Sequence, residues 1–159
     1  MKAVKHIAAL CLVIVMVLSF AACAQTEKTV TLRGDITEDL GMGMDATDTF
    51  VLTAKGDIVQ TIKEIMEIDF SEFSDEEAET AKALFDSLIV DVANEIEGVE
   101  CSSSIKNGTY TIEITITCSG KTLKEVAEAG ILELESDADR ISLKKSQASL
   151  EAQGYKVVD

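Results

Sequence analysis

The pair Asn107-Gly108 constrains the fold of this 159-residue chain most strongly, because two runs of alternating residues flank it. Asn-Gly is the strongest short-range signal for a two-residue β-hairpin turn. In that register the numbers of facing residues sum to 215, so Cys101 faces Ile114. Apolar side chains then meet on one face of the pairing, and we expect an antiparallel hairpin over residues 99–118.

Residues 49–70 predict a second hairpin, because alternating apolar residues stand on both sides of a Lys-Gly-Asp turn. A three-residue loop over residues 55–57 pairs Phe50 with Ile62. Gly56 can adopt the left-handed conformation that such a loop needs. This segment therefore supplies two more antiparallel strands.

The clearest helix begins at Ser74, which forms the capping-box pattern with Glu77. Its apolar residues recur at helical spacing, and Gly98 is a natural stop. The expected buried stripe comprises Ala78, Ala81, Phe85, Leu88, Val92 and Ile96, widened by Leu84, Ile89 and Ala93.

Two shorter helices complete the expected fold. A second capping-box pattern starts at Thr122, with Gly130 as its stop, and Ser142 and Gly154 bound the last helix. Residues 29–33 read as a first strand. We therefore expect an α+β fold, in which an antiparallel sheet from two hairpins packs on one long helix and two shorter helices.

Residues 1–22 have the parts of a secretory signal peptide of the lipoprotein type. Lys2 and Lys5 give a positive start, an apolar run without acids follows, and small residues precede Cys23. Cleavage before Cys23 would leave a thiol that takes a diacylglycerol, so Cys23 is the candidate lipidation residue.

Two other interpretations of this region stay open. Ala22-Cys23-Ala24 also fits the small-x-small signal for ordinary cleavage before Gln25, which would release a soluble protein. Residues 7–24 form an apolar stretch of 18 residues, just long enough to span a bilayer uncut.

The lipoprotein interpretation divides the chain into a signal peptide (1–22), a polar tether (23–28) and a single α+β domain (29–159). Without Lys2 and Lys5 the chain has 12 basic against 29 acidic residues, a net charge of −17. Such a domain repels nucleic acid and anionic headgroups, so we expect no nucleic-acid partner. Its expected membrane contact is the lipid anchor at Cys23.

The remaining composition excludes most catalytic and metal chemistry. The one histidine, His6, lies in the signal peptide, which excludes histidine-based nucleophilic catalysis and zinc sites in the mature chain. In the hairpin register Cys118 lies about 13 Å along the strand from Cys101, too far for a disulfide, so both read as buried thiols. We expect no catalytic, cofactor or metal residues.

The C-terminal sequence "ISLKKSQASLEAQGYKVVD", residues 141–159, resembles the ending of the YehR-like family of small uncharacterised bacterial lipoproteins. The signal peptide, cysteine, strand pairs and acidic helix start have a similar order. Phe20 departs from the family pattern, since lipoproteins usually carry leucine three residues before the cysteine. The resemblance implies an exported α+β domain that is lipid-anchored through Cys23, and it supplies no activity.

We therefore expect a cell-envelope lipoprotein on the extracytoplasmic side of the cell membrane. Its expected role is non-catalytic binding of an unknown envelope ligand or protein. The alternatives are a structural or chaperone-like envelope protein whose sheet edge receives another chain, and a carboxylate-based hydrolase.

Overall fold

The computed structural model describes residues 13–14, 26–41, 43–134 and 139–158. In chain order its elements are β1 (Val13–Ile14), β2 (Glu27–Asp35), α2 (Thr37–Leu40), β3 (Ala46–Lys55), β4 (Ile58–Asp69), α3 (Asp75–Phe85), η1 (Asp86–Val90), α4 (Asp91–Asn94), β5 (Val99–Lys106), β6 (Thr109–Thr117), α5 (Gly120–Glu128), β7 (Glu133–Leu134), α6 (Leu143–Ala152) and β8 (Lys156–Val158).

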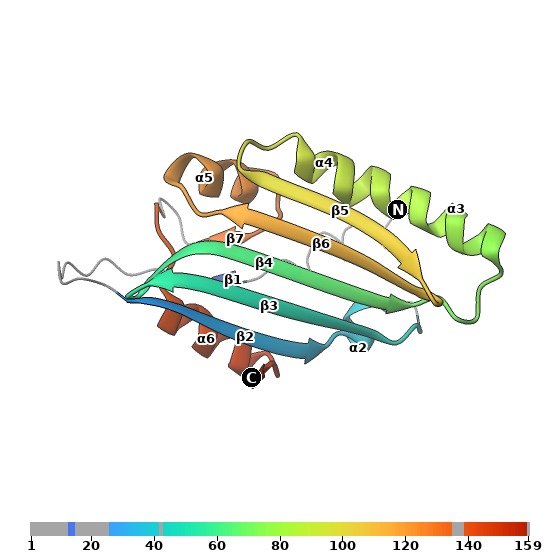
Figure 1. Ribbon diagram of the computed structural model, residues 1–159, viewed down its shortest axis with the longest axis horizontal. Helices are drawn as coiled ribbons and strands as arrows, with labels where there is room; N and C mark the ends of the chain where they lie inside the picture. Colours follow the sequence, from blue (N-terminus) through green and yellow to red (C-terminus); the bar gives the residue numbers. More distant parts are fainter. Residues whose placement is uncertain (1–12, 15–25, 42, 135–138, 159) are drawn as a thin grey trace.

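Six strands form one antiparallel sheet in the order β5-β6-β4-β3-β2-β8 (Figure 1). The two expected hairpins, β3-β4 and β5-β6, lie side by side through β4 and β6. The expected α+β class is confirmed. The first strand begins at Glu27, two residues before its expected start, and β8 is a strand that the sequence pattern did not predict.

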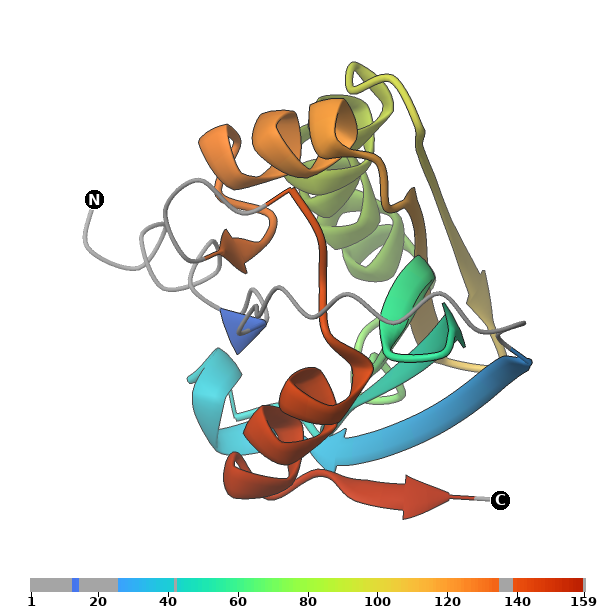
Figure 2. The ribbon, with the colours of Figure 1, turned by 90° about the vertical axis from the view of Figure 1, so that its left-hand side faces the viewer.

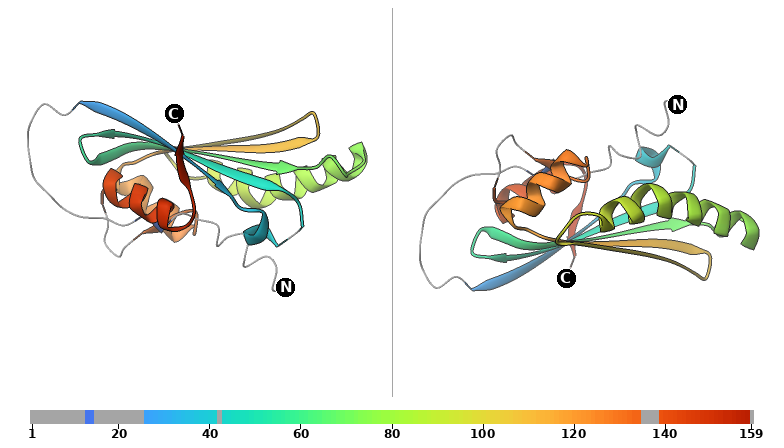
Figure 3. Two further views of the ribbon diagram at one scale, coloured as in Figure 1. Left: turned by 90° about the horizontal axis from the view of Figure 1, so that it is seen from below. Right: turned by 90° about the horizontal axis from the view of Figure 1, so that it is seen from above.

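The helices lie on one side of the sheet (Figure 3). The continuous helix α3-η1-α4 contacts edge strand β5, whereas α6 contacts β8 at the other edge. Strand β1 pairs in parallel with β7, and both lie between α5 and α6 on the helix side (Figure 2). The two central strands, β3 and β4, therefore lie between the part of the sheet near the long helix and the part near α6.

Strand residues alternate between a buried helix face and an open face. On β3 the buried positions run from Ala46 to Ala54 in steps of two. Hydroxyl side chains are frequent on the open face, and one row across four strands consists of Thr117, Thr61, Thr53 and Thr29. This alternation is typical of an antiparallel sheet with one solvated side.

The expected register of the β5-β6 hairpin is confirmed. Cys101 pairs with Ile114, as a two-residue turn requires. Asn107 and Gly108 have φ angles of 53° and 77°, the left-handed pair that this tight turn needs.

The expected register of the β3-β4 hairpin is wrong. The loop has two residues, Gly56 and Asp57, and the pairing shifts beyond Thr53, so Phe50 faces Glu64 rather than Ile62. A β-bulge absorbs the extra residue and keeps the apolar residues of β4 on the buried face. The Asp57 carboxylate is thereby free to accept a hydrogen bond from the Ser142 hydroxyl at 2.7 Å, at the start of α6.

Two of the three expected helix caps are confirmed. The Ser74 side chain accepts from the Glu77 amide while Glu77 accepts from the Ser74 amide, and Ser142 caps α6. The expected cap at Thr122 is wrong, because α5 begins one turn earlier. The Ser119 hydroxyl caps this helix by accepting from the Thr122 amide.

The long helix contains a π-helical turn, η1, in which the Asp91 amide donates to the carbonyl of Asp86. A π turn adds a residue and rotates the following helix relative to the preceding one. The expected buried stripe is confirmed in part. Ala78, Phe85 and Ala93 are buried, and Ala81, Ile89 and Ile96 are half-buried against the core. Three expected members are exposed instead: Leu84, Leu88 and Val92.

Candidate ligand-binding site

The predicted lipidation residue, Cys23, lies outside the described residues. No group of three or more His, Cys, Asp or Glu side chains that could hold a metal ion occurs within the part of the chain that the structure describes. Among these same residues no helix is both long and apolar enough to cross a membrane.

Two carboxylates, Asp48 and Glu64, lie on the buried face of the two central strands, and we call them the acidic pair. Asp48 on β3 is 0% exposed and Glu64 on β4 is 5% exposed. Phe50 faces Glu64 across the strands and Met66 faces Asp48, so the two carboxylates are diagonal neighbours among apolar side chains. Charged groups in such a position are costly unless they are paired or neutralised.

Tyr155, which follows α6, donates a hydrogen bond to the acidic pair. Its hydroxyl donates to Asp48 Oδ2 at 2.9 Å. The ring lies directly over Gly34, where a Cβ would come within 2.9 Å of ring carbons, and its centroid is 5.5 Å from that of Phe50. Gly34 therefore makes room for the aromatic ring that reaches the buried carboxylate.

The second oxygen, Asp48 Oδ1, is buried and has no hydrogen-bond partner among the residues that the structure describes. The basic residues nearest along the strands alternate to the open face, where Arg33 pairs with Glu67 at 3.0 Å and Lys63 with Glu113 at 2.8 Å. These two cations therefore lie on the opposite side of the sheet from the acidic pair.

Burial shifts the protonation of both carboxylates. It raises the pKa of Asp48 to about 7, an effect that the Tyr155 hydrogen bond partly opposes. Burial also holds the pKa of Glu64 well above its usual range, and the nearby Asp48 charge adds to this. Burial therefore favours the neutral, protonated form of both carboxyl groups.

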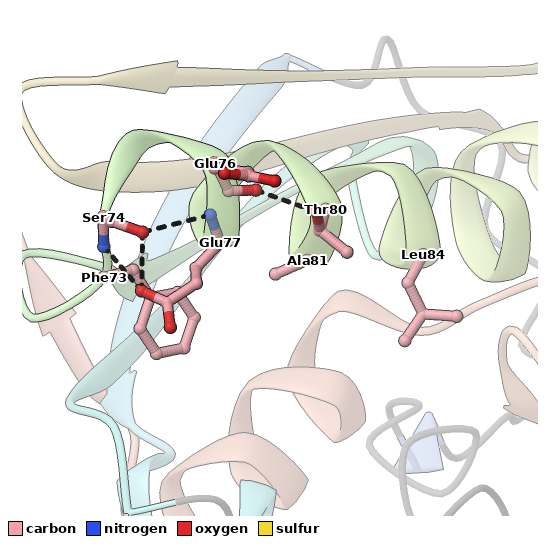
Figure 4. Close-up of a pocket in the computed structure, with 7 residues that line it drawn as sticks. All are labelled: Phe73, Ser74, Glu76, Glu77, Thr80, Ala81 and Leu84. Carbon is pink, nitrogen blue, oxygen red and sulfur yellow. Dashed lines mark hydrogen bonds between the residues drawn. The ribbon is translucent and has the colours of Figure 1, made fainter.

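A separate open groove of about 710 Å³ runs beside α3 (Figure 4). Its lining includes Phe73, Ala81 and Leu84, with the Ser74-Glu77 cap at one end. Leu88 and Val92 continue the row of exposed apolar side chains along the same helix. Ile89 and Ala93 pack against the core instead.

Asp86, the first residue of the π turn, ties the helix to the sheet. Its carboxylate accepts hydrogen bonds from Lys82, Ser103 and Tyr110, the last at 2.9 Å. Burial raises the pKa of Asp86, but these three donors outweigh it and leave the pKa below its usual value. This carboxylate is fully partnered, so its role is structural.

Cys101 and Cys118 are free thiols on the helix side of the sheet, as expected, but they are half-buried rather than buried. Burial raises the pKa of Cys101 to about 11 and that of Cys118 to about 12. Such thiols stay protonated at neutral pH and are poor nucleophiles. Neither cysteine supplies catalytic chemistry in this state.

The sequence reasoning missed the acidic pair, although a signal was present. Glu64 stands between Ile62 and Met66 at the period of two that marks the buried face of a strand. Asp48 was missed because the second hairpin was predicted to begin at residue 49, whereas β3 already begins at Ala46.

Comparisons with known proteins place the chain in a family. The family described as "Protein of unknown function (DUF1307)" matches residues 39–156. The solution structure of YehR from E. coli covers 86% of this chain and 94% of its own, at 19% identity and a TM-score of 0.61. A Streptococcus pneumoniae TIGR4 protein covers 90% of this chain and 92% of its own, at 16% identity and a TM-score of 0.54.

None of the curated proteins compared with the chain matches it. At these identities the two solved structures establish the fold alone. The match over residues 39–156 spans well over half of the chain, and the resemblance of its ending to YehR-like proteins agrees with it. The chain therefore belongs to the YehR-like DUF1307 family, whose function is unknown.

Proposed function

We propose that the chain is a cell-envelope lipoprotein, anchored through a lipidated Cys23 on the extracytoplasmic side of the cell membrane. Its domain binds a ligand or partner without catalysing a reaction. The anchor is supported by the positively charged start, the apolar run and the small residues before Cys23. Two acyl chains hold a protein firmly, which suits a domain whose negative charge gains nothing from anionic headgroups.

The observation that carries the binding role is the unpartnered, fully buried oxygen Asp48 Oδ1. Buried polar atoms in folded proteins nearly always have a partner, and an orphan needs an explanation. Asp48 Oδ1 lies on the helix-facing side of the central strand β3, between the part of the sheet near the long helix and the part near α6. A ligand on the helix side of the sheet would supply the missing partner.

The anchor is tested by the mass of the N-terminal peptide and by membrane fractionation of wild type, Cys23→Ala and Cys101→Ala. The proposal predicts a wild-type peptide that begins at Cys23 and carries a diacylglyceryl group. Cys23→Ala should lose the lipid, whereas Cys101→Ala, the matched cysteine control, should retain it. An unlipidated wild-type peptide that begins at Gln25, or a full-length chain that stays in the membrane, would contradict the proposal.

The acidic pair also favours a second candidate, a carboxylate-based hydrolase. Raised pKa values are typical of general acids. A general acid must, however, come within hydrogen-bond reach of the substrate, and both carboxylates are buried. Hydrolysis of cell-wall glycans that Glu64→Gln abolishes, while Glu67→Gln leaves it intact, would establish this candidate in place of the first.

The structural or chaperone-like alternative finds less support. Edge strand β5 presents Glu100, Ser102, Ser104 and Lys106 on its open face, and the other edge strand, β8, has three residues. Charged residues and short edge strands hinder the pairing of a sheet edge with another chain.

A further inference from the structure

We propose that the groove beside α3 is the docking site for a positively charged amphipathic helix of a partner protein. This surface is separate from the acidic pair, so the inference goes beyond the proposed function and does not depend on Asp48 or Glu64. It follows from three properties of the groove: its exposed apolar side chains, its fixed shape and its negative charge.

Four large apolar side chains are exposed along the long helix and the turn before it. Phe73 is 36% exposed and Leu84 is 59% exposed, while Leu88 and Val92 are 42% and 43% exposed. The last three recur every four residues, whereas Phe85 of the same helix is buried in the core. A helix on the surface of a single domain normally buries its apolar stripe, and a contiguous exposed row marks an interaction site.

The row has the length and spacing that a helical partner needs. The groove of about 710 Å³ follows α3 from Phe73 to Leu84 (Figure 4), and its helical part together with the rest of the row extends from Ala81 to Val92. That distance is about 16 Å at about 1.5 Å per residue, the length covered by partner residues i, i+4, i+7 and i+11. An extended partner would pair with the edge of a sheet, which α3 does not offer, so the groove favours a helix.

The groove is held in shape before a partner arrives. The ring of Phe73 packs on that of Phe70 with centroids 4.9 Å apart, and Phe70 stacks on Tyr110 at 5.2 Å. The Ser74 cap fixes the first turn of α3, and the hydrogen bonds of Asp86 fix its far end to the sheet. A surface that is already ordered loses little conformational freedom on binding.

Acidic residues surround the apolar row. Residues 75–94 carry six acidic residues and one basic residue, Lys82, which pairs with Asp86. The described lining of the groove includes Glu76 and Glu77 but no lysine or arginine. Hydrogen bonds at the helix cap hold the pKa of Glu77 below its usual value, so this carboxylate is ionised at neutral pH. Charge complementarity therefore selects a partner helix with lysine or arginine beside its apolar face.

The same charge disfavours a second copy of this chain as the occupant. The chain has a net charge of −15, and two acidic helices side by side would bring like charges together. An anionic lipid surface is repelled for the same reason. A basic segment of another protein is the occupant that this surface fits.

The test is titration of the wild-type protein with a fluorescent synthetic peptide of two heptads, whose leucines form one helical face and whose lysines form the other. Two further peptides replace every lysine by glutamate or every leucine by serine. The protein is purified as the cell makes it, in phosphatidylcholine nanodiscs if the mass of its N-terminal peptide shows a lipid and in buffer if it does not. Failure of the proposed anchor is therefore read from that mass, whereas failure of the groove is read from the titration.

The groove variants are Leu84→Ser, Leu88→Ser and Glu76→Gln. Val157→Ser is the matched apolar control, because Val157 is 48% exposed on β8 at one edge of the sheet. Glu100→Gln is the matched charge control, because Glu100 is an exposed glutamate of β5. Thermal unfolding of each variant verifies that it is folded, and empty nanodiscs give the background.

We expect saturable binding of the leucine-lysine peptide that Leu84→Ser or Leu88→Ser weakens about fivefold or more, the effect of losing the burial of half a leucine side chain. Glu76→Gln should weaken binding about twofold and added NaCl should weaken it further, whereas both control variants should bind as wild type does. The other two peptides should bind more weakly than the leucine-lysine peptide. Equal binding by wild type and the folded leucine variants, tighter binding of the leucine-glutamate peptide, or self-association of wild type that Leu84→Ser abolishes would overturn the proposal.

Discussion

Replacing Asp48 by Asn should remove a large part of the pH dependence of the domain's stability. Burial raises the pKa of Asp48 to about 7 in the folded chain, from an ordinary value of 3.8. The folded chain therefore holds a proton that the unfolded chain releases. This contribution to stability is complete below about pH 4 and is lost as the pH rises through about 7.

The size of the effect follows from the two pKa values. At about 1.4 kcal/mol per pKa unit, the difference between 3.8 and about 7 corresponds to about 4 kcal/mol in all, of which about 3 kcal/mol falls between pH 5 and pH 8. Asn at this position keeps an oxygen for the Tyr155 hydroxyl and carries no charge. Its buried amide group costs about 1–3 kcal/mol at every pH, so the slope with pH carries the prediction.

The assay is urea denaturation of wild type, Asp48→Asn and Glu67→Gln at several values between about pH 5 and pH 8. The unfolding free energy of wild type should fall by about 3 kcal/mol more than that of Asp48→Asn over this range. Glu67→Gln should follow wild type, which separates the effect from the general repulsion among acids. Parallel curves for wild type and Asp48→Asn would refute the reasoning.

Three further predictions concern the supports of the site. Tyr155→Phe removes the donor to Asp48 and should destabilise the domain by about 1–3 kcal/mol, more at pH 8 than at pH 5, in the same denaturation assay. Leu88→Ser should change the unfolding free energy by less than about 0.5 kcal/mol, because Leu88 is exposed. Phe85→Ala should lower it by about 3–5 kcal/mol, because Phe85 is buried. Similar losses for the two variants would contradict this difference in burial along the long helix. Cys101 and Cys118, with pKa values of about 11 and about 12, should react with a thiol reagent at pH 8 far more slowly in the folded than in the urea-unfolded chain, and equal rates would contradict their burial.

Local signals of turn and cap chemistry predicted much of this fold. Asn107-Gly108 determines the β5-β6 register because few residues other than these tolerate the left-handed turn. Ser74 and Glu77 determine the start of α3 because they satisfy free backbone amides. Such signals depend on neighbours within a few residues, which a sequence shows directly.

The sequence-based predictions failed where contacts between residues far apart in the chain determine the local structure. The β3-β4 bulge is compatible with either loop length, and the Asp57 contact with α6 that accompanies it involves residues 85 positions apart. The π turn at Asp86 depends on Ser103 and Tyr110, which belong to the following hairpin. Strand β8 follows Tyr155, whose ring packs on Gly34. This contact joins residues far apart in the chain, and no local sequence pattern predicts it.

The candidate site was only partly predictable. The period of two in β4 places Glu64 on the buried face, but the partnership with Asp48 requires the β3-β4 register. The predicted pairing of Phe50 with Ile62 would also bring position 48 opposite Glu64, but the hairpin was predicted to begin at residue 49, so Asp48 was left outside the strand. Cys23 remains a prediction from the sequence.

The most direct test of our account is the titration of the Asp48 carboxyl carbon by NMR, in wild type and in Tyr155→Phe. In wild type, Asp48 should titrate near pH 7. The Tyr155 hydroxyl stabilises the carboxylate, so the account predicts that Tyr155→Phe raises the pKa of Asp48 further. An Asp48 that titrates near its ordinary value of 3.8 in the folded chain would contradict the claim that this carboxyl is buried in the core.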